Sequence, residues 1–327
     1  MQTKILALSI GIGSYAKLPT LTCPPNDAKD FAMVVHSGLT SSEIKLLTNS
    51  DATKESILKA LAWLAGASRA TDTAILFFSG HGGRHSRFDK QSFLCPVDTQ
   101  TTDLEKTSLT HRELTETLRS IKSGRLVVFL DTCHSGGVGD IEVKTGVEPG
   151  LKAIVEGNGR FILASSPPDA PALESSTMRN GIFTTYLLEA LQGEVAHADG
   201  RVWTSDVFSF VAHRMRRDHT QNIYQKAVGE NFVILTRDRP SSGPIPIINS
   251  SSGDQRALRI AMRSVYDRSE LSRLCREMGV DIENLPGRTL ENQILDLIDL
   301  CHRHGLRHRL LEFLQEDHPE LFQSTKL

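Results

Sequence analysis

The sequence lacks any uninterrupted apolar run of roughly 18 residues, the length that a membrane-spanning helix needs. The opening stretch "MQTKILALSIGIGSY" carries one Lys and a short apolar run that breaks at "GIGSY", and no small-residue cleavage site follows. We therefore interpret it as a first β-strand and not as a signal peptide. There is no surplus of charge either, because 37 Lys and Arg face 39 Asp and Glu. This balance gives no reason to expect nucleic acid or a membrane as partner.

Cysteine is scarce, and its pattern excludes a disulfide scaffold. The chain has five cysteines, an odd number, and they are widely spaced with no CxxC pair: Cys23, Cys95, Cys133, Cys275 and Cys301. We expect reduced thiols and a cytoplasmic protein. The "CHRH" stretch at 301–304 has no second ligand pair that would complete a zinc site, so we assign it to a helix surface.

Apolar runs of strand length alternate with amphipathic patterns of helical period through the first two thirds of the chain. The runs occupy 4–10, 44–47, 74–78, 125–130, 160–165 and 231–235. The helical patterns occupy 26–38, 53–68, 110–120, 180–193 and 204–215. Nearly continuous apolar strands alternating with helices predict an α/β domain with a mostly parallel sheet covered on both faces.

The composition changes at "DRPSSGPIPIINSSSGD", where Pro, Ser and Gly gather as they do in linkers. After it, apolar residues follow helical spacing at 255–266, 269–279, 289–305 and 306–317, and Gly279 and Gly305 stand where helices end. The predicted organisation is a domain over 1–237, a linker over 238–253, an all-α bundle over 254–320 and a tail over 321–327.

Two glycine-rich loops carry reactive residues. "AILFF" leads into "SGHGG" at 79–83, and "LVVFL" leads into "DTCHSGG" at 131–137. Both follow a predicted parallel strand at its carboxyl end, where open α/β sheets bind ligands. A Cys needs a base nearby to act as a nucleophile at neutral pH, which makes His81 and Cys133 the natural catalytic couple.

These two motifs resemble the catalytic His and Cys motifs of caspase-like cysteine proteases, particularly metacaspases and their bacterial relatives. The resemblance spans about residues 4–236 and includes "GIGSY", "NDA" and "ASS". It implies a three-layer sandwich around a mostly parallel six-stranded sheet, and a peptidase that forms an acyl-enzyme. It also makes the backbone N–H groups of Gly82 and Cys133 the candidates for the oxyanion hole.

The caspase "QAC-x-G" box is absent, since Asp131 and Thr132 precede the Cys. In metacaspases, the matching acid, the matching Ser and the Asp of "NDA" line the pocket for the residue before the scissile bond. Here these are Asp131, Ser79 and Asp27. Two carboxylates in one pocket favour a basic side chain, so we expect cleavage after Arg, then Lys. The alternative for Asp27 is an ordinary acidic residue in the first turn of a helix.

The resemblance raises two further questions, calcium and self-cleavage. Asp98 and Asp140 match the acidic positions at which many metacaspases bind calcium, but two oxygen donors are few for that ion, and we expect no cofactor. Lys144, Lys152 and Arg160 are candidate self-cleavage sites in the segment 138–160. The alternative is an ordinary mobile surface loop.

The bundle, chiefly through "LCREMGVDIENLPG", resembles the effector-associated domains of bacterial conflict systems. That implies recruitment by a sensor or adaptor protein, with oligomerisation on activation, whereas the alternative is a structural appendage. The favoured function is a recruited endopeptidase of bacterial defence or programmed cell death. The alternatives are a catalytically silent scaffold, an Asn-specific peptidase or ligase, and activation by a small signal nucleotide.

Overall fold

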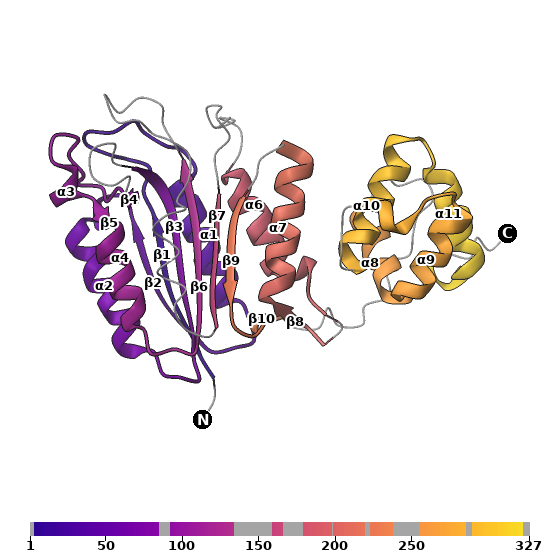
Figure 1. Ribbon diagram of the computed structural model, residues 1–327, viewed down its shortest axis with the longest axis horizontal. Helices are drawn as coiled ribbons and strands as arrows, with labels where there is room; N and C mark the ends of the chain where they lie inside the picture. The colour runs from indigo at the N-terminus through magenta and orange to yellow at the C-terminus, as the bar shows by residue number, and fades with distance from the viewer. Residues whose placement is uncertain are drawn as a thin grey trace. The chain divides into compact units, whose positions relative to one another are not determined.

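The computed structural model describes residues 3–84, 92–133, 159–165, 179–197, 199–219, 223–237, 255–285 and 290–322 (Figure 1). The chain divides into two compact units, Met1–Arg237 and Asp238–Leu327. The first is an α/β unit and the second is helical, which confirms the predicted fold class. Among the described helices, none has both the length and the apolar character needed to cross a bilayer.

The first unit is built on a sheet whose main strands lie in the order β2-β1-β3-β6-β7-β9. Neighbours from β2 to β7 run parallel, and β9 runs antiparallel to β7. Two short strands extend the sheet, since β4 pairs with the end of β3 and β5 pairs with β4. The strands of this sheet are β1 (Ile5–Gly11), β2 (Ser42–Thr48), β3 (Thr73–Arg84), β4 (Ser92–Leu94), β5 (Leu109–Thr110), β6 (Arg125–Cys133), β7 (Arg160–Ser165) and β9 (Ile223–Val228).

The run at 231–235 does contain a strand, β10 (Val233–Thr236), but this strand lies outside the main sheet. It pairs with β8 (Arg201–Trp203) in a separate two-stranded sheet. The sixth strand of the main sheet is β9, whose side chains are half-buried or exposed throughout. An edge strand has no second neighbour to bury it, so its apolar signal is weaker than that of a central strand.

Helices cover both faces of the sheet (Figure 1). On one face lie α2 (Lys54–Ala67) and α4 (His111–Ser120), with the short α3 (Leu104–Thr107) nearby. On the other lie α1 (Pro24–His36), α6 (Ile182–Glu189) and α7 (Thr204–His219). A π-helical turn, Ala190–Glu194, continues α6.

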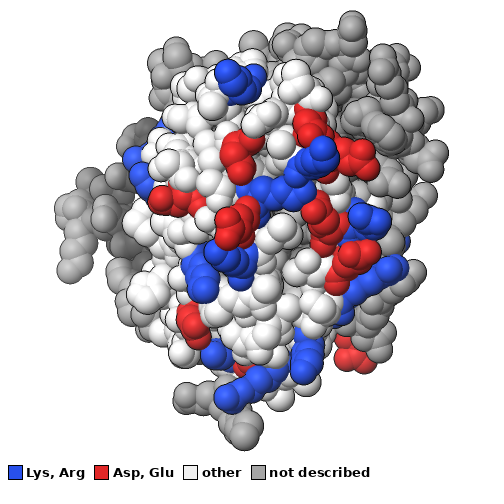
Figure 2. Space-filling model, turned by 90° about the vertical axis from the view of Figure 1, so that its left-hand side faces the viewer, with Lys and Arg blue, Asp and Glu red and all other residues white. Residues whose placement is uncertain are grey.

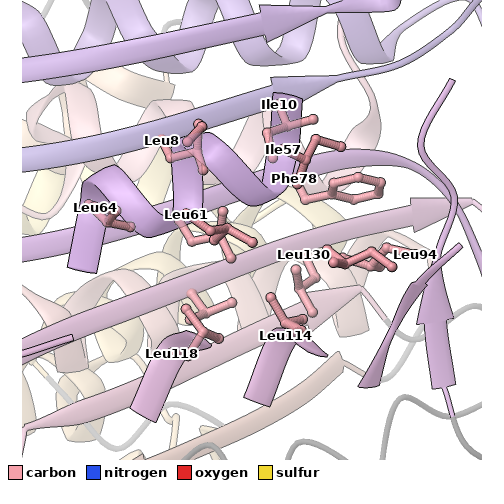
Figure 3. Close-up of a cluster of buried hydrophobic side chains, with 14 of the residues drawn as sticks. Leu8, Ile10, Ile57, Leu61, Leu64, Phe78, Leu94, Leu114, Leu118 and Leu130 are labelled. Atoms are coloured by element: carbon pink, nitrogen blue, oxygen red, sulfur yellow. The ribbon is translucent and has the colours of Figure 1, made fainter. Parts of the chain in front are cut away.

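Adjacent aromatic residues of β3 belong to opposite faces, because successive side chains of a strand alternate. Phe77 stacks on Phe31 of α1 with ring centroids 4.5 Å apart. Phe78 joins the cluster that α2 and α4 cover, which includes Leu61 and Leu118 (Figure 3). Strand β3 is therefore buried on both sides, which explains its unbroken apolar run. It also directs the next residue, Ser79, to the face of α1.

The outer surface over α2, α3 and α4 mixes charges of both signs (Figure 2). Ion pairs of these elements join Lys59 to Glu55, Lys54 to Glu113 and Lys106 to Asp103. Among the described residues of this face, positive and negative side chains are therefore interspersed and form no single-signed patch of the kind that attracts nucleic acid.

In the described part of the second unit, four α-helices pack around an apolar core that includes Leu274, Leu297 and Leu314. The helices are α8 (Gln255–Val265), α9 (Arg268–Glu277), α10 (Leu290–Arg303) and α11 (Arg307–Asp317). Gly279 and Gly305 follow α9 and α10 with φ of 75° and 67°, so these two glycines end the helices as predicted.

Candidate active site

His81 and Cys133 occupy neighbouring positions on adjacent parallel strands. They are register partners of β3 and β6, and they lie at the carboxyl end of that pairing. The structure thus brings the backbones of the two predicted catalytic residues side by side. Cys133 is described by its backbone alone, and residues 134–137 of its motif lie outside the described residues.

The imidazole of His81 is buried, with 2% of the residue exposed. Its Nε2 lies 2.8 Å from the carbonyl oxygen of Pro19. A carbonyl can only accept, so Nε2 carries the hydrogen and Nδ1 is the nitrogen that can exchange a proton with a substrate or a thiol. Sequence reasoning missed Pro19, because any residue type supplies a backbone carbonyl.

The orientation of the Gly82 backbone follows from the pairing of β3 with β4. The N–H of Cys95 donates to the carbonyl of His81 at 2.9 Å, which makes these two residues a hydrogen-bonding pair. Bonding sides alternate along an antiparallel strand, so the N–H of Gly82 points away from β4, towards the side on which β6 ends. This direction supports the prediction that Gly82 donates to an oxyanion.

Three polar residues that are predicted to line a substrate pocket lie near His81 and Cys133. Ser79 and Asp131 are register partners, and the Ser79 hydroxyl donates to Asp27 Oδ2 at 2.9 Å. All three are buried. Asp27 lies in the first turn of α1, which Pro24 and Pro25 begin because proline fits the start of a helix.

The start of α6 completes this cluster. The N–H of Gly181 donates to Asp27 Oδ1 at 2.9 Å, and the hydroxyl of Thr184 donates to Asp131 Oδ2 at 2.7 Å. On the other side, the hydroxyl of Ser165 donates to Asp131 Oδ1 at 3.0 Å. Sequence reasoning missed these three donors, although Ser165 belongs to the "ASS" stretch quoted for the resemblance.

The two carboxylates lie close together. A Cβ on Gly181 would lie 2.9 Å from Asp131 Oδ2 and 3.4 Å from Asp27 Oδ2. Burial first, and then the charge of Asp131, raises the pKa of Asp27 to about 7, against the opposing hydrogen bonds from Gly181 and Ser79. Near neutral pH the carboxyl of Asp27 is therefore divided between its neutral and ionised forms, and a buried cation would favour the ionised form.

Residues 179–180, just before α6, form hydrogen bonds with Asp30 of α1. The guanidinium of Arg179 donates to both oxygens of Asp30 at 2.8 Å, and the amide of Asn180 donates to the same carboxylate at 3.0 Å. The hydrogen bonds from Arg179 are the main cause that lowers the pKa of Asp30. Asp27 and Asp30, one helical turn apart, therefore sit in opposite electrostatic environments.

No cluster of three or more His, Cys, Asp or Glu side chains that could hold a metal ion occurs within the described ranges. Asp98 accepts a hydrogen bond from the N–H of Lys54 at 2.9 Å, at the start of α2. Asp140 lies outside the described residues. The carboxylate of Asp98 therefore accepts one of the unpaired N–H groups at the start of α2.

Of the three candidate self-cleavage residues, the structure describes Arg160 alone. Lys144 and Lys152 lie outside the described residues. Arg160 begins β7, where it pairs with Leu126 on one side and Val228 on the other, and its guanidinium donates to the carbonyl of Ile121 at 2.9 Å. A strand paired on both edges is a poor protease substrate, so this placement argues against Arg160.

Comparisons with known proteins agree with this arrangement. Residues 4–238 match the family described as "Caspase domain", and residues 258–319 match "Effector-associated domain 7". Metacaspase-1 of Botryotinia fuckeliana is 30% identical over 149 residues, which cover 41% of this chain and 35% of that protein. Metacaspase-3 of Arabidopsis thaliana is 29% identical over 149 residues, which cover 41% of each chain.

The matched region thus spans well under half the length of these relatives. A crystal structure of a protein from Geobacter sulfurreducens superposes with a TM-score of 0.51 at 19% identity, covering 72% of this chain and 98% of that one. This likeness concerns the fold.

Proposed function

Because the chain belongs to the caspase domain family, we propose that it is a cysteine endopeptidase that uses Cys133 and His81 and cleaves after Arg, then Lys. The observation that carries the proposal is the register pairing of His81 with Cys133 beside the buried cluster of Asp27, Ser79 and Asp131. This arrangement supports the proposal, because it would place a nucleophile and a base next to acidic residues that could bind a cation.

The proposed reaction is acyl transfer. The thiol proton of Cys133 passes to Nδ1 of His81, and the thiolate attacks the scissile carbonyl carbon. The N–H groups of Gly82 and Cys133 stabilise the oxyanion. As the intermediate collapses, the C–N bond breaks and the imidazolium gives its proton to the leaving amine. Water then attacks the acyl-enzyme while His81 takes its proton, and the carboxylic acid leaves as the thiolate re-forms.

The specificity follows from the cluster of carboxylates. Each carboxylate already accepts at least two hydrogen bonds, and these hold it in place without neutralising it. A guanidinium presents a planar fork that can engage both carboxylates, whereas an ammonium is a single point of charge. An acidic side chain would add a further negative charge to a buried acidic site. We therefore rank Arg above Lys, and both above Asp and Asn.

The test uses fluorogenic peptides that differ only in the residue before the scissile bond, with Arg, Lys, Asp or Asn there. The wild-type chain should cleave the Arg peptide best and the Lys peptide next. Cys133→Ala should abolish all cleavage, and Asp131→Asn should raise KM for the Arg peptide much more than it lowers kcat. Preference for Asp or Asn would overturn the specificity, and activity in Cys133→Ala would overturn the mechanism.

The match of residues 258–319 to an effector-associated domain favours a recruited enzyme. In this proposal a sensor or adaptor gathers copies of the chain through its second unit, in bacterial defence or programmed cell death. The second candidate function, a silent scaffold, rests on the same match. To test the scaffold, copies of the wild-type chain are forced to dimerise through a fused dimerisation domain. If the protein then cleaves none of the peptides, the scaffold is favoured.

Self-cleavage at Lys144 or Lys152 is part of the same proposal. Mass spectrometry of incubated wild-type protein should reveal fragments that end at one of these lysines. Their absence, or their presence in Cys133→Ala, would remove self-cleavage from the proposal.

A further inference from the structure

Tyr15 contacts the proposed catalytic histidine both through its hydroxyl and through its ring. We propose that Tyr15 is a positioning residue for His81, and that Asn49 acts through Tyr15 by fixing the loop that carries it. The inference rests on the proposed function of His81 as the base that serves Cys133.

The hydroxyl of Tyr15 stands in for a backbone hydrogen bond. His81 and Cys95 face each other where β3 meets the chain that leaves β4, and the N–H of Cys95 donates to His81 at 2.9 Å. A regular antiparallel pair would also form the reciprocal bond, from His81 to Cys95. Here the N–H of His81 donates to the Tyr15 hydroxyl at 2.9 Å, and that hydroxyl donates to the carbonyl of Cys95 at 3.2 Å. A side chain thus determines the backbone position of the histidine.

The ring of Tyr15 acts on the imidazole itself. The two ring centroids are 4.8 Å apart with the planes inclined by 40°. Four residues further along the same loop, Pro19 accepts the hydrogen of Nε2 at 2.8 Å. The loop therefore restricts the backbone, the ring plane and the tautomer of one histidine. Each of these must be right before Nδ1 can exchange a proton with Cys133.

Asn49 holds this loop at its start. Its Oδ1 accepts hydrogen bonds from the N–H groups of Gly13 at 2.9 Å and Ser14 at 3.0 Å, the two residues before Tyr15. Among the described residues, Asn49 is the one non-glycine with a positive φ, 45°. Asn tolerates this left-handed conformation better than most residues, and strained backbone of this kind gathers at functional sites. The contacts form a connected path from Asn49 through the loop to Tyr15 and His81.

Packing alone is the competing explanation for Tyr15, since its ring also lies against two apolar clusters of the first unit. The Phe variant separates the two explanations, because it keeps the ring and removes the hydroxyl. For Asn49, Gly keeps the left-handed backbone and removes the amide, whereas Asp keeps an acceptor oxygen.

The experiment measures kcat and KM of full-length variants on the Arg peptide, with tryptophan fluorescence as the check that the first unit is folded. We expect Tyr15→Phe to lose about 10- to 100-fold in kcat, because misplacement of a catalytic group by about 1 Å costs that order. KM should stay within about twofold, since the carboxylate cluster is untouched. Asn49→Gly should lose kcat in the same way but less, and Asn49→Asp should restore most of it.

A double variant tests the path. If Asn49 acts through Tyr15, Tyr15→Phe combined with Asn49→Gly should be no slower than Tyr15→Phe alone. Tyr266→Phe is the matched control, because it also removes a hydroxyl bonded to one acceptor, Asp317 at 3.1 Å, but in the second unit. Unchanged kcat in folded Tyr15→Phe, or additive losses in the double variant, would overturn the proposal.

A second readout needs no substrate turnover. Alkylation of Cys133 by iodoacetamide at neutral pH, followed by mass spectrometry, reports thiolate formation, and the other four cysteines are buried. If alkylation is slower in Tyr15→Phe than in wild type, the positioning role of Tyr15 is supported. This holds even if the wild type cleaves no peptide, and in that case only the proposed peptidase function fails. Cleavage by wild type with equal rates in both proteins would retain the function and reject the role of Tyr15.

Discussion

The buried pair of carboxylates predicts that Asp27→Asn stabilises the first unit while it impairs recognition of Arg. Asn is close in shape to the protonated Asp and can still accept the N–H of Gly181. It removes the ionisation that burial and Asp131 oppose. Because the folded pKa of about 7 lies above the ordinary 3.8, the wild type loses stability as pH rises through that interval.

The magnitude follows from the two pKa values. Each unit of difference is worth about 1.4 kcal/mol. Ionisation of Asp27 should therefore cost the wild type about 2 kcal/mol at pH 5 and about 4 kcal/mol at pH 8, relative to a group of unshifted pKa. The advantage of Asp27→Asn should grow by about 2 kcal/mol between these pH values.

The assay is urea unfolding followed by tryptophan fluorescence at pH 5, 6, 7 and 8, in the Cys133→Ala background to prevent self-cleavage. The chain has two tryptophans, Trp63 and Trp203, and both belong to the first unit, so the signal reports that unit alone. With a slope of about 2.5 kcal/mol per molar urea, the extra stability at pH 8 shifts the midpoint by roughly 1.5 M.

Asp30→Asn is the control, because the pKa of Asp30 is shifted downward by Arg179. A lowered pKa contributes stability above the unfolded pKa and loses it only as pH falls through the folded pKa. Asp30→Asn should thus be less stable than wild type from pH 5 to 8, by an amount that does not change. A pH-independent difference for Asp27→Asn, or a loss of stability at pH 8, would refute the reasoning.

Three further predictions concern the same unit. Gly181→Ala should raise KM for the Arg peptide and lower stability by about 1–3 kcal/mol, because the added methyl meets the Asp131 carboxylate at 2.9 Å; an unchanged KM would contradict this. The Ki of agmatine, a guanidinium inhibitor, should rise by up to about tenfold per pH unit below pH 7, because Asp27 must lose its proton; Asp27→Asn should flatten that dependence. Thr110→Ala should cost about 1 kcal/mol in urea unfolding, because it removes the capping box that begins α4, and Thr117→Ala is the comparison within the same helix.

The central strands of the fold could be predicted from the sequence because both of their faces are buried. Strands such as β3 and β6 have neighbours on both edges and helices on both faces, so their sequences are continuous apolar runs that stand out. Strand β9 was missed because only one of its edges is paired within the sheet, and its side chains are half-buried or exposed. The run at 231–235 is equally apolar but belongs to a small separate sheet. Which strands pair is a property of the whole chain and not of one run.

The site was predictable where chemistry demands a side chain of one type. His81, Cys133 and Asp131 stand out because few roles combine those residues with glycines at strand ends. Pro19 contributes only a carbonyl, and Thr184 only a hydroxyl at the start of a helix. Such contacts depend on the path of the backbone, which motif reading does not give.

The pairing of β6 with β7 has a consequence for the integrity of the chain. These neighbours in the sheet come from either side of residues 134–158, so their association depends on the ladder and not on the polypeptide between them. A chain severed within that interval would remain a non-covalent complex of two fragments. The proposed pocket for a basic residue would then lie at the junction of the two fragments. One fragment would carry Asp27, Ser79 and Asp131, and the other would carry the donors to the two carboxylates: Ser165, Gly181 and Thr184. If the pocket binds Arg as proposed, neither fragment should do so alone, and co-expression of the two should reconstitute the site.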